Sequence, residues 1–214
     1  MSKMAKEACI IFDMDGTLID SSFAMAQSVN HVREHLGLSA ISKEDLEYYI
    51  NQPDQDLPKI FYNTAEYDPI HRSLFREHYL KSSSEHIQLY PDVKEMLHFM
   101  SERSKLCIAT NASDFFARHM LEHLQIIDFF DGVVGANNVP SPKPNPMMLE
   151  LLMENTSTLK ERTLMVGDSI KDEQAAENAD IPFIFVNWGY GKSETARMKA
   201  HTIHELIALF HVLI

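Results

Sequence analysis

Short apolar segments alternate along the chain with longer stretches in which apolar residues recur every three or four positions. The short segments end in polar or turn-forming residues, as buried strands do, and they are residues 8–12, 105–109, 133–135, 162–166 and 181–186. The longer stretches have the spacing of amphipathic helices, and they are residues 91–102, 113–124, 144–154, 170–179 and 203–213. Pro91 is expected at the first position of its helix. Strands that alternate with helices predict an α/β fold, with a Rossmann-like parallel sheet covered by helices on both faces.

The alternation stops between residues 21 and 88, where the pattern is helical and no strand is predicted. Apolar residues there keep the three-to-four spacing of a helix, as in Leu46, Tyr49 and Ile50. We expect this insertion to lie over the end of the sheet that binds ligands.

These patterns predict two domains. Residues 1–20 and 85–214 are expected to form the α/β core, and residues 21–84 an inserted α-helical cap. Ser82-Ser83-Ser84 is predicted to be a hinge or a surface turn near the second connection. The apolar C-terminal run from Leu206 to Ile214 is predicted to be a helix packed on the sheet.

Length and charge narrow the class of protein. The chain has 214 residues, about 1.4 domains at roughly 150 residues per domain, which suits one α/β domain with an insertion. It is 45% hydrophobic and 23% charged, enough to build a core, and its formal net charge is −12. That charge disfavours binding to nucleic acid or to an anionic membrane, because both surfaces are negative. A small phosphorylated ligand stays compatible, because a bound divalent cation can reverse the local field.

Nothing in the sequence predicts secretion or a disulfide framework. Cys9 and Cys107 both lie within apolar runs and are expected to be buried free thiols. No segment approaches the roughly 20 apolar residues that span a bilayer, and the first apolar run ends early at Asp13. We expect a cytoplasmic protein; the sequence does not predict its oligomeric state.

Polar side chains follow several of the predicted strands at the point where each strand ends. In a parallel sheet these ends lie along one edge, where ligands bind. The residues expected to converge there are Asp13, Asp15, Thr110, Asn111, Lys143, Asp168 and Asp172.

This set of side chains has a defined chemistry. Carboxylates supply the oxygen ligands that Mg²⁺ prefers, with Asp172 binding either directly or through water. Lys143, Thr110 and the Asn111 amide can donate to phosphoryl oxygens. An aspartate such as Asp13 can accept a phosphoryl group, and a second carboxyl such as Asp15 can move the protons. Each motif alone is common in loops and helix caps, and their occurrence together, each after its own strand, is what favours a catalytic site.

Four motifs resemble those of the haloacid dehalogenase superfamily of phosphohydrolases. They are residues 12–18 (FDMDGTL), Thr110-Asn111, Lys143-Pro144 and residues 167–172 (GDSIKD). The resemblance spans residues 8 to about 192, and the helical insertion resembles that of the subfamily with an α-helical cap. Within this subfamily, residues 188–191 (WGYG) and 18–21 (LIDS) are most similar to phosphoglycolate phosphatases and their relatives.

The resemblance implies a role for each residue. Asp13 would be the nucleophile and Asp15 the general acid and base, while Thr110 and Lys143 would bind phosphate. The metal ligands would be Asp13, the Asp15 carbonyl, Asp168 and Asp172, and the cofactor Mg²⁺. The implied activity is hydrolysis of a small phosphate monoester through an aspartyl-phosphate intermediate, with neither a nucleic acid nor a membrane as partner.

Two positions depart from the relatives, and alternatives stay open. Residues 50–53 read Ile-Asn-Gln-Pro where relatives often carry Ile-Gly-x-Pro, so the substrate is open; Asn51 and Gln52 are candidates for contacts with the leaving group. The helix after the last motif ends in Ala179-Asp180 instead of Ala-Gly. The alternatives are a sugar-phosphate mutase of the β-phosphoglucomutase type, a dehalogenase, which needs neither a metal nor Asp15, and a non-catalytic phosphate-binding protein on the same fold.

Overall fold

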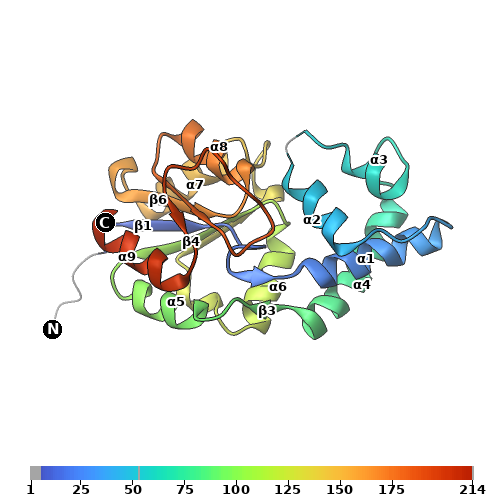
Figure 1. Cartoon of the computed structure of the whole chain (residues 1–214), viewed down its shortest axis with the longest axis horizontal. Coiled ribbons are helices and arrows are strands. Elements are labelled where there is room, and N and C mark those ends of the chain that lie inside the picture. Colours follow the sequence, from blue (N-terminus) through green and yellow to red (C-terminus); the bar gives the residue numbers. More distant parts are fainter. Residues whose placement is uncertain (1–5, 53, 214) are drawn as a thin grey trace.

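A parallel sheet of six strands forms the centre of the protein (Figure 1). The computed structural model describes residues 6–52 and 54–213. The strands lie in the order β5-β4-β1-β6-β7-β8, and every pair is parallel. Their bounds are β1 Cys9–Phe12, β4 Lys105–Thr110, β5 Gly132–Gly135, β6 Thr163–Gly167, β7 Phe183–Val186 and β8 Lys199–Ala200. The predicted α/β fold is confirmed, and the five predicted strands are in place to within two residues.

Helices cover both faces of this sheet, as the alternating side chains of β1 require. Ile10 and Phe12 join one buried cluster, with α5 (Val93–Ser101), α6 (Asp114–His123) and α9 (Ile203–Leu213). Cys9 and Ile11 point to the other face and join a second cluster, with α7 (Met147–Thr156) and α8 (Ile170–Ala179). Because both faces are buried, β1 is apolar at every position, which is typical of a parallel sheet. Short 3₁₀ helices lie at Ile127–Phe129, Ala136–Asn138 and Lys160–Arg162.

The boundaries of several elements differ from the prediction. Pro91 is not the first helical residue, because Asp92 adopts a left-handed conformation (φ 65°) and α5 begins at Val93. Strand β8 was not predicted, since its two residues, one of them a lysine, form no apolar run. Cys9 and Cys107 are buried and free, as expected, with their sulfur atoms 3.8 Å apart on neighbouring strands.

Four helices between β1 and α5 form a separate group beside one end of the sheet (Figure 1). They are α1 (Ser22–His35), α2 (Lys43–Asn51), α3 (Leu57–Tyr62) and α4 (Pro69–His86). Their own apolar cluster is formed by Ala26, Val29, Val32, Leu46, Phe61 and Tyr62. This arrangement agrees with a helical insertion, and the domain limits at residues 20–21 and 84–85 stay a prediction.

The prediction of a hinge or turn at Ser82-Ser83-Ser84 is wrong. The three serines lie inside α4, and Ser82 and Ser83 are buried. Their hydroxyls have partners there: Ser84 donates to the Leu80 carbonyl at 3.0 Å, and Ser82 donates to the Gln27 side chain at 2.9 Å. Satisfied hydroxyls can continue a helix, so a run of serines need not interrupt it.

A two-stranded antiparallel ribbon joins the sheet to the four helices. It pairs β2 (Ile19–Asp20) with β3 (Gln88–Leu89), the two crossings of the chain between these parts. Within the described residues, Gln88 is thus a strand residue in the stretch 21–88, where none was predicted. The ribbon fixes the start of α1 and the end of α4 beside each other.

The C-terminal helix packs on the sheet as predicted, through the described part of the run up to residue 213. Phe210 is 1% exposed, and its ring lies edge-on to Phe12 of β1, with 6.3 Å between the ring centroids. Among the described residues, the structure contains no helix with the length and apolar character needed to cross a membrane. Ile214 lies outside the described residues.

Phe210 should therefore contribute strongly to stability. We expect Phe210→Ala to lower the free energy of unfolding by about 3–5 kcal/mol, because it leaves a cavity against β1. Urea denaturation followed by circular dichroism measures this difference. Val212, 82% exposed on the same helix, provides the control, and Val212→Ala should change stability by less than about 0.5 kcal/mol. Equal effects of the two substitutions would contradict the packing described here.

Candidate active site

Three buried carboxylates meet at the carboxyl end of the central strands. Asp13 follows β1, Asp168 follows β6, and Asp172 lies in the first turn of α8. Each offers an oxygen, and these oxygens lie within 4.8 Å of one another. Strands β1 and β6 are neighbours in the sheet, which is why residues 155 positions apart in sequence meet. The convergence expected for these three residues is therefore observed.

Lys143 lies between two of these carboxylates. Its Nζ donates to Asp13 Oδ1 and to Asp172 Oδ1, each at 2.6 Å, and its side chain is 2% exposed. Asn111 holds the lysine through its main chain: the amide Nδ2 donates to the Lys143 carbonyl at 2.8 Å, and Oδ1 accepts from the Lys143 N–H at 3.0 Å. Asn111 thus positions Lys143. The second N–H of the Asn111 amide remains for the phosphate contact predicted from the sequence.

Thr110 is the last residue of β4 and is buried. Its Oγ1 accepts from the Ala112 N–H at 3.1 Å, so its hydroxyl proton is not used by that bond. Thr110 and Asn111 both belong to the β4 terminus, beside β1 in the sheet. Their proposed contact with phosphate stays a prediction.

Asp15 lies in the turn that follows Asp13. The turn is possible because Gly16 adopts a left-handed conformation (φ 84°), and a Cβ there would overlap the Asp168 carboxylate. The hydroxyl of Ser21 donates a hydrogen bond to Asp15 Oδ1. The first motif therefore presents two carboxyl groups with different partners, Asp13 with Lys143 and Asp15 with Ser21.

Burial sets the electrostatics of the site. It raises the pKa of Asp13 well above its ordinary value, although the ammonium of Lys143 acts in the opposite direction. Burial and the neighbouring Asp172 raise the pKa of Asp168 to about 7. Burial alone would lower the pKa of Lys143, but the adjacent Asp13 and Asp172 carboxylates raise it above its usual range. When all three carboxyl groups are ionised, they carry more negative charge than one ammonium compensates.

This donor set fits a divalent cation. Asp13, Asp168 and Asp172 offer oxygen atoms only, which suits a hard cation such as Mg²⁺, and a second positive charge would relieve their mutual repulsion. The triad could therefore hold a metal ion. The contribution predicted for the Asp15 carbonyl stays a prediction.

A loop after β7 holds Asp168 through residues for which no role was predicted from the sequence. The main-chain N–H groups of Tyr190 and Gly191 donate to Asp168 Oδ2 at 2.7 and 3.2 Å, and Thr17 Oγ1 donates to Oδ1 at 3.4 Å. A Cβ on Gly189 or Gly191 would overlap Asp168 or the main chain of Gly16. Glycines on either side of Tyr190 were the available sign that this loop approaches another backbone closely.

The helical group touches the site through Lys171, the neighbour of Asp172. Its Nζ donates to the carbonyl of Ile50, at the end of α2, at 2.6 Å. Burial lowers the pKa of Lys171, and the charges of Asp172, Lys143 and Asp13 also act on it. The end of α2 therefore lies close to the carboxylate cluster.

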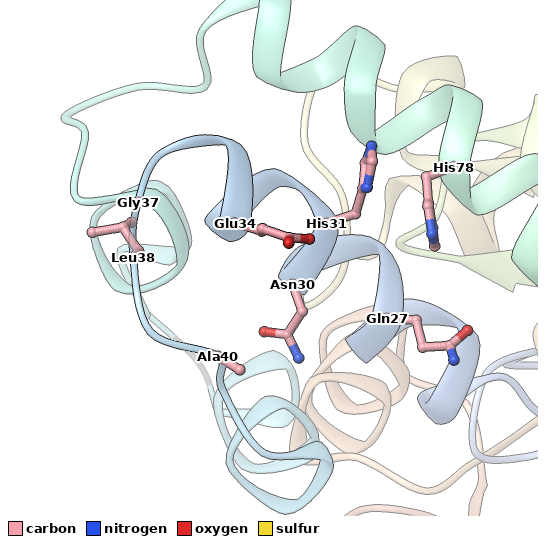
Figure 2. Close-up of a pocket in the computed structure, with 8 residues that line it drawn as sticks. All are labelled: Gln27, Asn30, His31, Glu34, Gly37, Leu38, Ala40 and His78. Atoms are coloured by element: carbon pink, nitrogen blue, oxygen red, sulfur yellow. The ribbon is translucent and has the colours of Figure 1, made fainter.

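A hollow of about 640 Å³ lies elsewhere, along α1, the loop that follows it and one residue of α4 (Figure 2). It is lined by Gln27, Asn30, His31, Glu34, Gly37, Leu38, Ala40 and His78. None of these residues belongs to the carboxylate site, and the amide of Asn30 is bonded to the main chain of Ile41. The carboxylate cluster remains the candidate active site.

Known proteins are similar to this chain in sequence and in fold. The sequence profile of the haloacid dehalogenase-like hydrolase family matches residues 10–186. The chain belongs to this family. A phosphoglycolate phosphatase of Vibrio parahaemolyticus is 32% identical over 195 residues, 86% of each chain, and one of Rhodobacter capsulatus is 31% identical over 210 residues, 94% of each.

Two solved structures have a similar fold along nearly the whole chain. A haloacid dehalogenase-like hydrolase from Streptococcus pneumoniae, SP0104, gives a TM-score of 0.82 at 25% identity, covering 97% of this chain and 100% of its own. A β-phosphoglucomutase-like protein from Thermotoga maritima gives 0.75 at 25% identity, covering 96% and 100%. The haloacid dehalogenase resemblance inferred from the four motifs is thus confirmed.

Asp168 should make the metal-free protein sensitive to pH. Its pKa is raised by folding, so the folded state binds this proton more tightly than the unfolded state, and the free energy of unfolding should fall as the pH rises from about 5 to 8. In the presence of EDTA, we expect this decrease in the free energy of unfolding to be larger in the wild type than in Asp168→Asn, by ~1 kcal/mol or more. Urea denaturation at several pH values measures both slopes. Parallel slopes would contradict the raised pKa.

Lys143 should be essential to stability in the absence of metal. Lys143→Met keeps the aliphatic stem and removes the charge, leaving Asp13 and Asp172 without their shared partner. We expect a loss of about 3–5 kcal/mol in the free energy of unfolding, measured in EDTA at neutral pH. Lys160 is exposed, and Lys160→Met should change stability by less than about 0.5 kcal/mol. A Lys143→Met protein as stable as that control would be inconsistent with the ion pairs.

Proposed function

We propose that the protein is a Mg²⁺-dependent phosphomonoester hydrolase that acts on a small phosphorylated metabolite through an aspartyl-phosphate intermediate. The observation that carries the proposal is the meeting of Asp13 with Asp168, Asp172 and Lys143 in one buried cluster. The phosphatase relatives support it. A cytoplasmic location and the absence of nucleic-acid or membrane partners remain part of the proposal.

Asp13 is the proposed nucleophile. Its Oδ1 contacts Lys143 Nζ, so the ammonium that would hold a phosphoryl oxygen lies next to the attacking carboxylate. Thr110 at the end of β4 would supply a further donor to the phosphoryl oxygens. The side chain of Asn111 keeps Lys143 in place through its two hydrogen bonds to the Lys143 main chain. Positioning and neutralisation of charge provide most of the acceleration in such a transfer.

Asp15 is the proposed general acid and base. Burial raises the pKa of Asp15, which keeps a proton on its carboxyl at higher pH than in water, and Ser21 orients the group through Oδ1. A carboxyl that retains its proton can deliver it to a leaving oxygen.

The chemistry proceeds in two steps. In the first, an Asp13 oxygen bonds to phosphorus, the ester P–O bond breaks, and the Asp15 proton moves to the departing alcohol oxygen. In the second, water attacks phosphorus, Asp15 takes a proton from that water, and the bond from Asp13 to phosphorus breaks to release inorganic phosphate. Asp13 and Asp15 both return to their starting states.

Mg²⁺ would be held by Asp13, Asp168, Asp172 and the Asp15 carbonyl. When bound, it would supply positive charge to the phosphoryl group. Tyr190 and Gly191 hold Asp168 with their N–H groups, and Ser169 holds Asp172 Oδ2 with its hydroxyl at 2.6 Å, so the ligands are oriented in advance.

Phosphoglycolate is the first substrate to test, because the phosphoglycolate phosphatases are the sequence relatives described above. Asn51 and Gln52 at the end of α2 remain candidates for contacts with the leaving group. Asn51 Nδ2 is buried and has no hydrogen-bond partner among the described residues, and the adjacent Ile50 carbonyl is held by Lys171 near the carboxylates. Pro53, the next element of this departure from the relatives, lies outside the described residues.

A sugar-phosphate mutase is the second candidate, favoured by the likeness to the β-phosphoglucomutase-like structure. It would use the same core residues and return the phosphoryl group to a sugar hydroxyl. The assembled cluster of Asp13, Lys143 and the metal-ligand carboxylates argues against a non-catalytic binding protein, since binding alone requires no nucleophile at that position.

The decisive experiment is a turnover screen over phosphorylated metabolites, including phosphoglycolate, sugar phosphates, nucleoside monophosphates and pyrophosphate. We expect phosphate release with Mg²⁺, its loss in EDTA, and a fall of about 10³-fold or more in kcat for Asp13→Asn. Asp128 is exposed on the core surface, and Asp128→Asn should keep the wild-type rate.

Two outcomes would redirect the proposal. Undiminished turnover in Asp13→Asn would exclude the aspartyl-phosphate route. Conversion of glucose 1-phosphate to glucose 6-phosphate with a bisphosphate primer, faster than phosphate release, would establish the mutase instead.

A further inference from the structure

The first helix of the cap begins in an unusual way. Ser21 occupies the N-cap position of α1, and a serine there ordinarily accepts a hydrogen bond from the first turn of its own helix. Within the described part of the chain, the Ser21 side chain makes no such bond. Its hydroxyl donates to Asp15 Oδ1 instead. The hydroxyl of this N-cap residue therefore binds Asp15, the proposed general acid and base, and not its own helix.

Tyr190 supplies an acceptor for the first main-chain N–H groups of this helix start. Its hydroxyl oxygen accepts from the Ser21 N–H at 2.7 Å and from the Ser22 N–H at 3.0 Å. The tyrosine's own proton lies within reach of Asp20 Oδ1, at 3.3 Å. The Ser22 N–H has a second acceptor in Asp20 Oδ1, at 3.3 Å. The start of α1 is therefore capped in part by a side chain from a loop 169 residues further along the chain.

The main chain of the same residue holds the metal-ligand side of the site. Tyr190 N–H donates to Asp168 Oδ2 at 2.7 Å, and Trp188 Nε1, two residues earlier, donates to the Thr17 carbonyl at 3.0 Å. The glycines on either side of Tyr190 allow this close approach, because a Cβ on either would overlap Asp168. The loop is thus fixed against both the first motif and Asp168.

We propose that Tyr190 is a positioning residue: its hydroxyl holds the first turn of α1 so that the Ser21 hydroxyl is aimed at Asp15, while its N–H holds Asp168. The proposal rests on the proposed function, because it assigns Asp15 the proton transfer. It also means that the start of the cap is fixed by the same residue that orients the general acid.

The chemistry of the leaving group separates this role from a merely structural one. An alkyl phosphate such as 2-phosphoglycolate releases an alkoxide that needs the Asp15 proton, whereas p-nitrophenyl phosphate releases a phenolate stable without it. The value of kcat/KM reports the steps up to transfer of the phosphoryl group to Asp13, which include protonation of the leaving oxygen. A misplaced Asp15 therefore affects the first substrate more than the second.

The test compares wild type, Tyr190→Phe, Ser21→Ala and the double variant on both substrates with Mg²⁺. We expect Tyr190→Phe to lower kcat/KM for 2-phosphoglycolate about tenfold or more, and for p-nitrophenyl phosphate by less than about threefold. Ser21→Ala should show the same selectivity, and the double variant should be little worse than Ser21→Ala, because the two groups act in series. Tyr67→Phe, which removes a hydroxyl within the cap, should leave both values within about twofold of the wild type.

Equal losses on the two substrates, no loss on either, or additive effects in the double variant would each overturn the proposal. Amide hydrogen exchange provides a readout independent of turnover: the Ser21 amide, whose acceptor is the Tyr190 hydroxyl, should exchange at least about tenfold faster in Tyr190→Phe than in wild type. Unchanged exchange at the Ser21 amide would also overturn it. If the wild type turns over neither these two substrates nor any metabolite of the screen above, the proposed function fails, and the exchange comparison still decides whether Tyr190 holds this turn.

Discussion

The shared ion pair of Lys143 with Asp13 and Asp172 is the interaction around which this protein is organised. Three carboxylates buried at the end of a parallel sheet repel one another, and one ammonium at 2.6 Å from two of them offsets part of that repulsion. Three neighbouring segments keep this arrangement in place. Asn111 fixes the lysine, Gly16 lets the first motif turn beside Asp168, and the loop after β7 fixes Asp168 itself. The remaining excess of negative charge is what a metal ion would satisfy.

Sequence patterns identified the core well because its strands are buried on both faces. An uninterrupted apolar run such as residues 9–12, followed at once by aspartates, is typical of a buried parallel strand that ends at a polar edge. Elements without that signal were missed: β8 has two residues, and the β2–β3 ribbon is defined by pairing between distant segments. The serine run in α4 misled because hydroxyl bonds to the helix itself and to Gln27 occur only after the chain has folded.

The site shows the same division. Residues that come directly after strands could be expected to meet, since the sheet brings the strand ends together; Asp13 and Asp168 are of this kind. Residues that act through long-range contacts could not be found in this way. Nothing local in the sequence indicates that Asn111 binds the main chain of Lys143, or that the hydroxyl of Ser21 leaves its own helix for Asp15. These contacts depend on loops whose paths are set by tertiary structure.

The hydrogen bond from Lys171 to the Ile50 carbonyl connects the cap to a charged side chain next to the carboxylate cluster. With α2 in this position the Lys171 side chain is partly buried, and its charge acts on Asp13 and Asp172. If the cap moves away, water surrounds the same charge and screens it. The potential felt by an incoming anion would then differ between the open and docked states. The contact between Lys171 and α2 thus links the position of the cap to the electrostatic potential of the site.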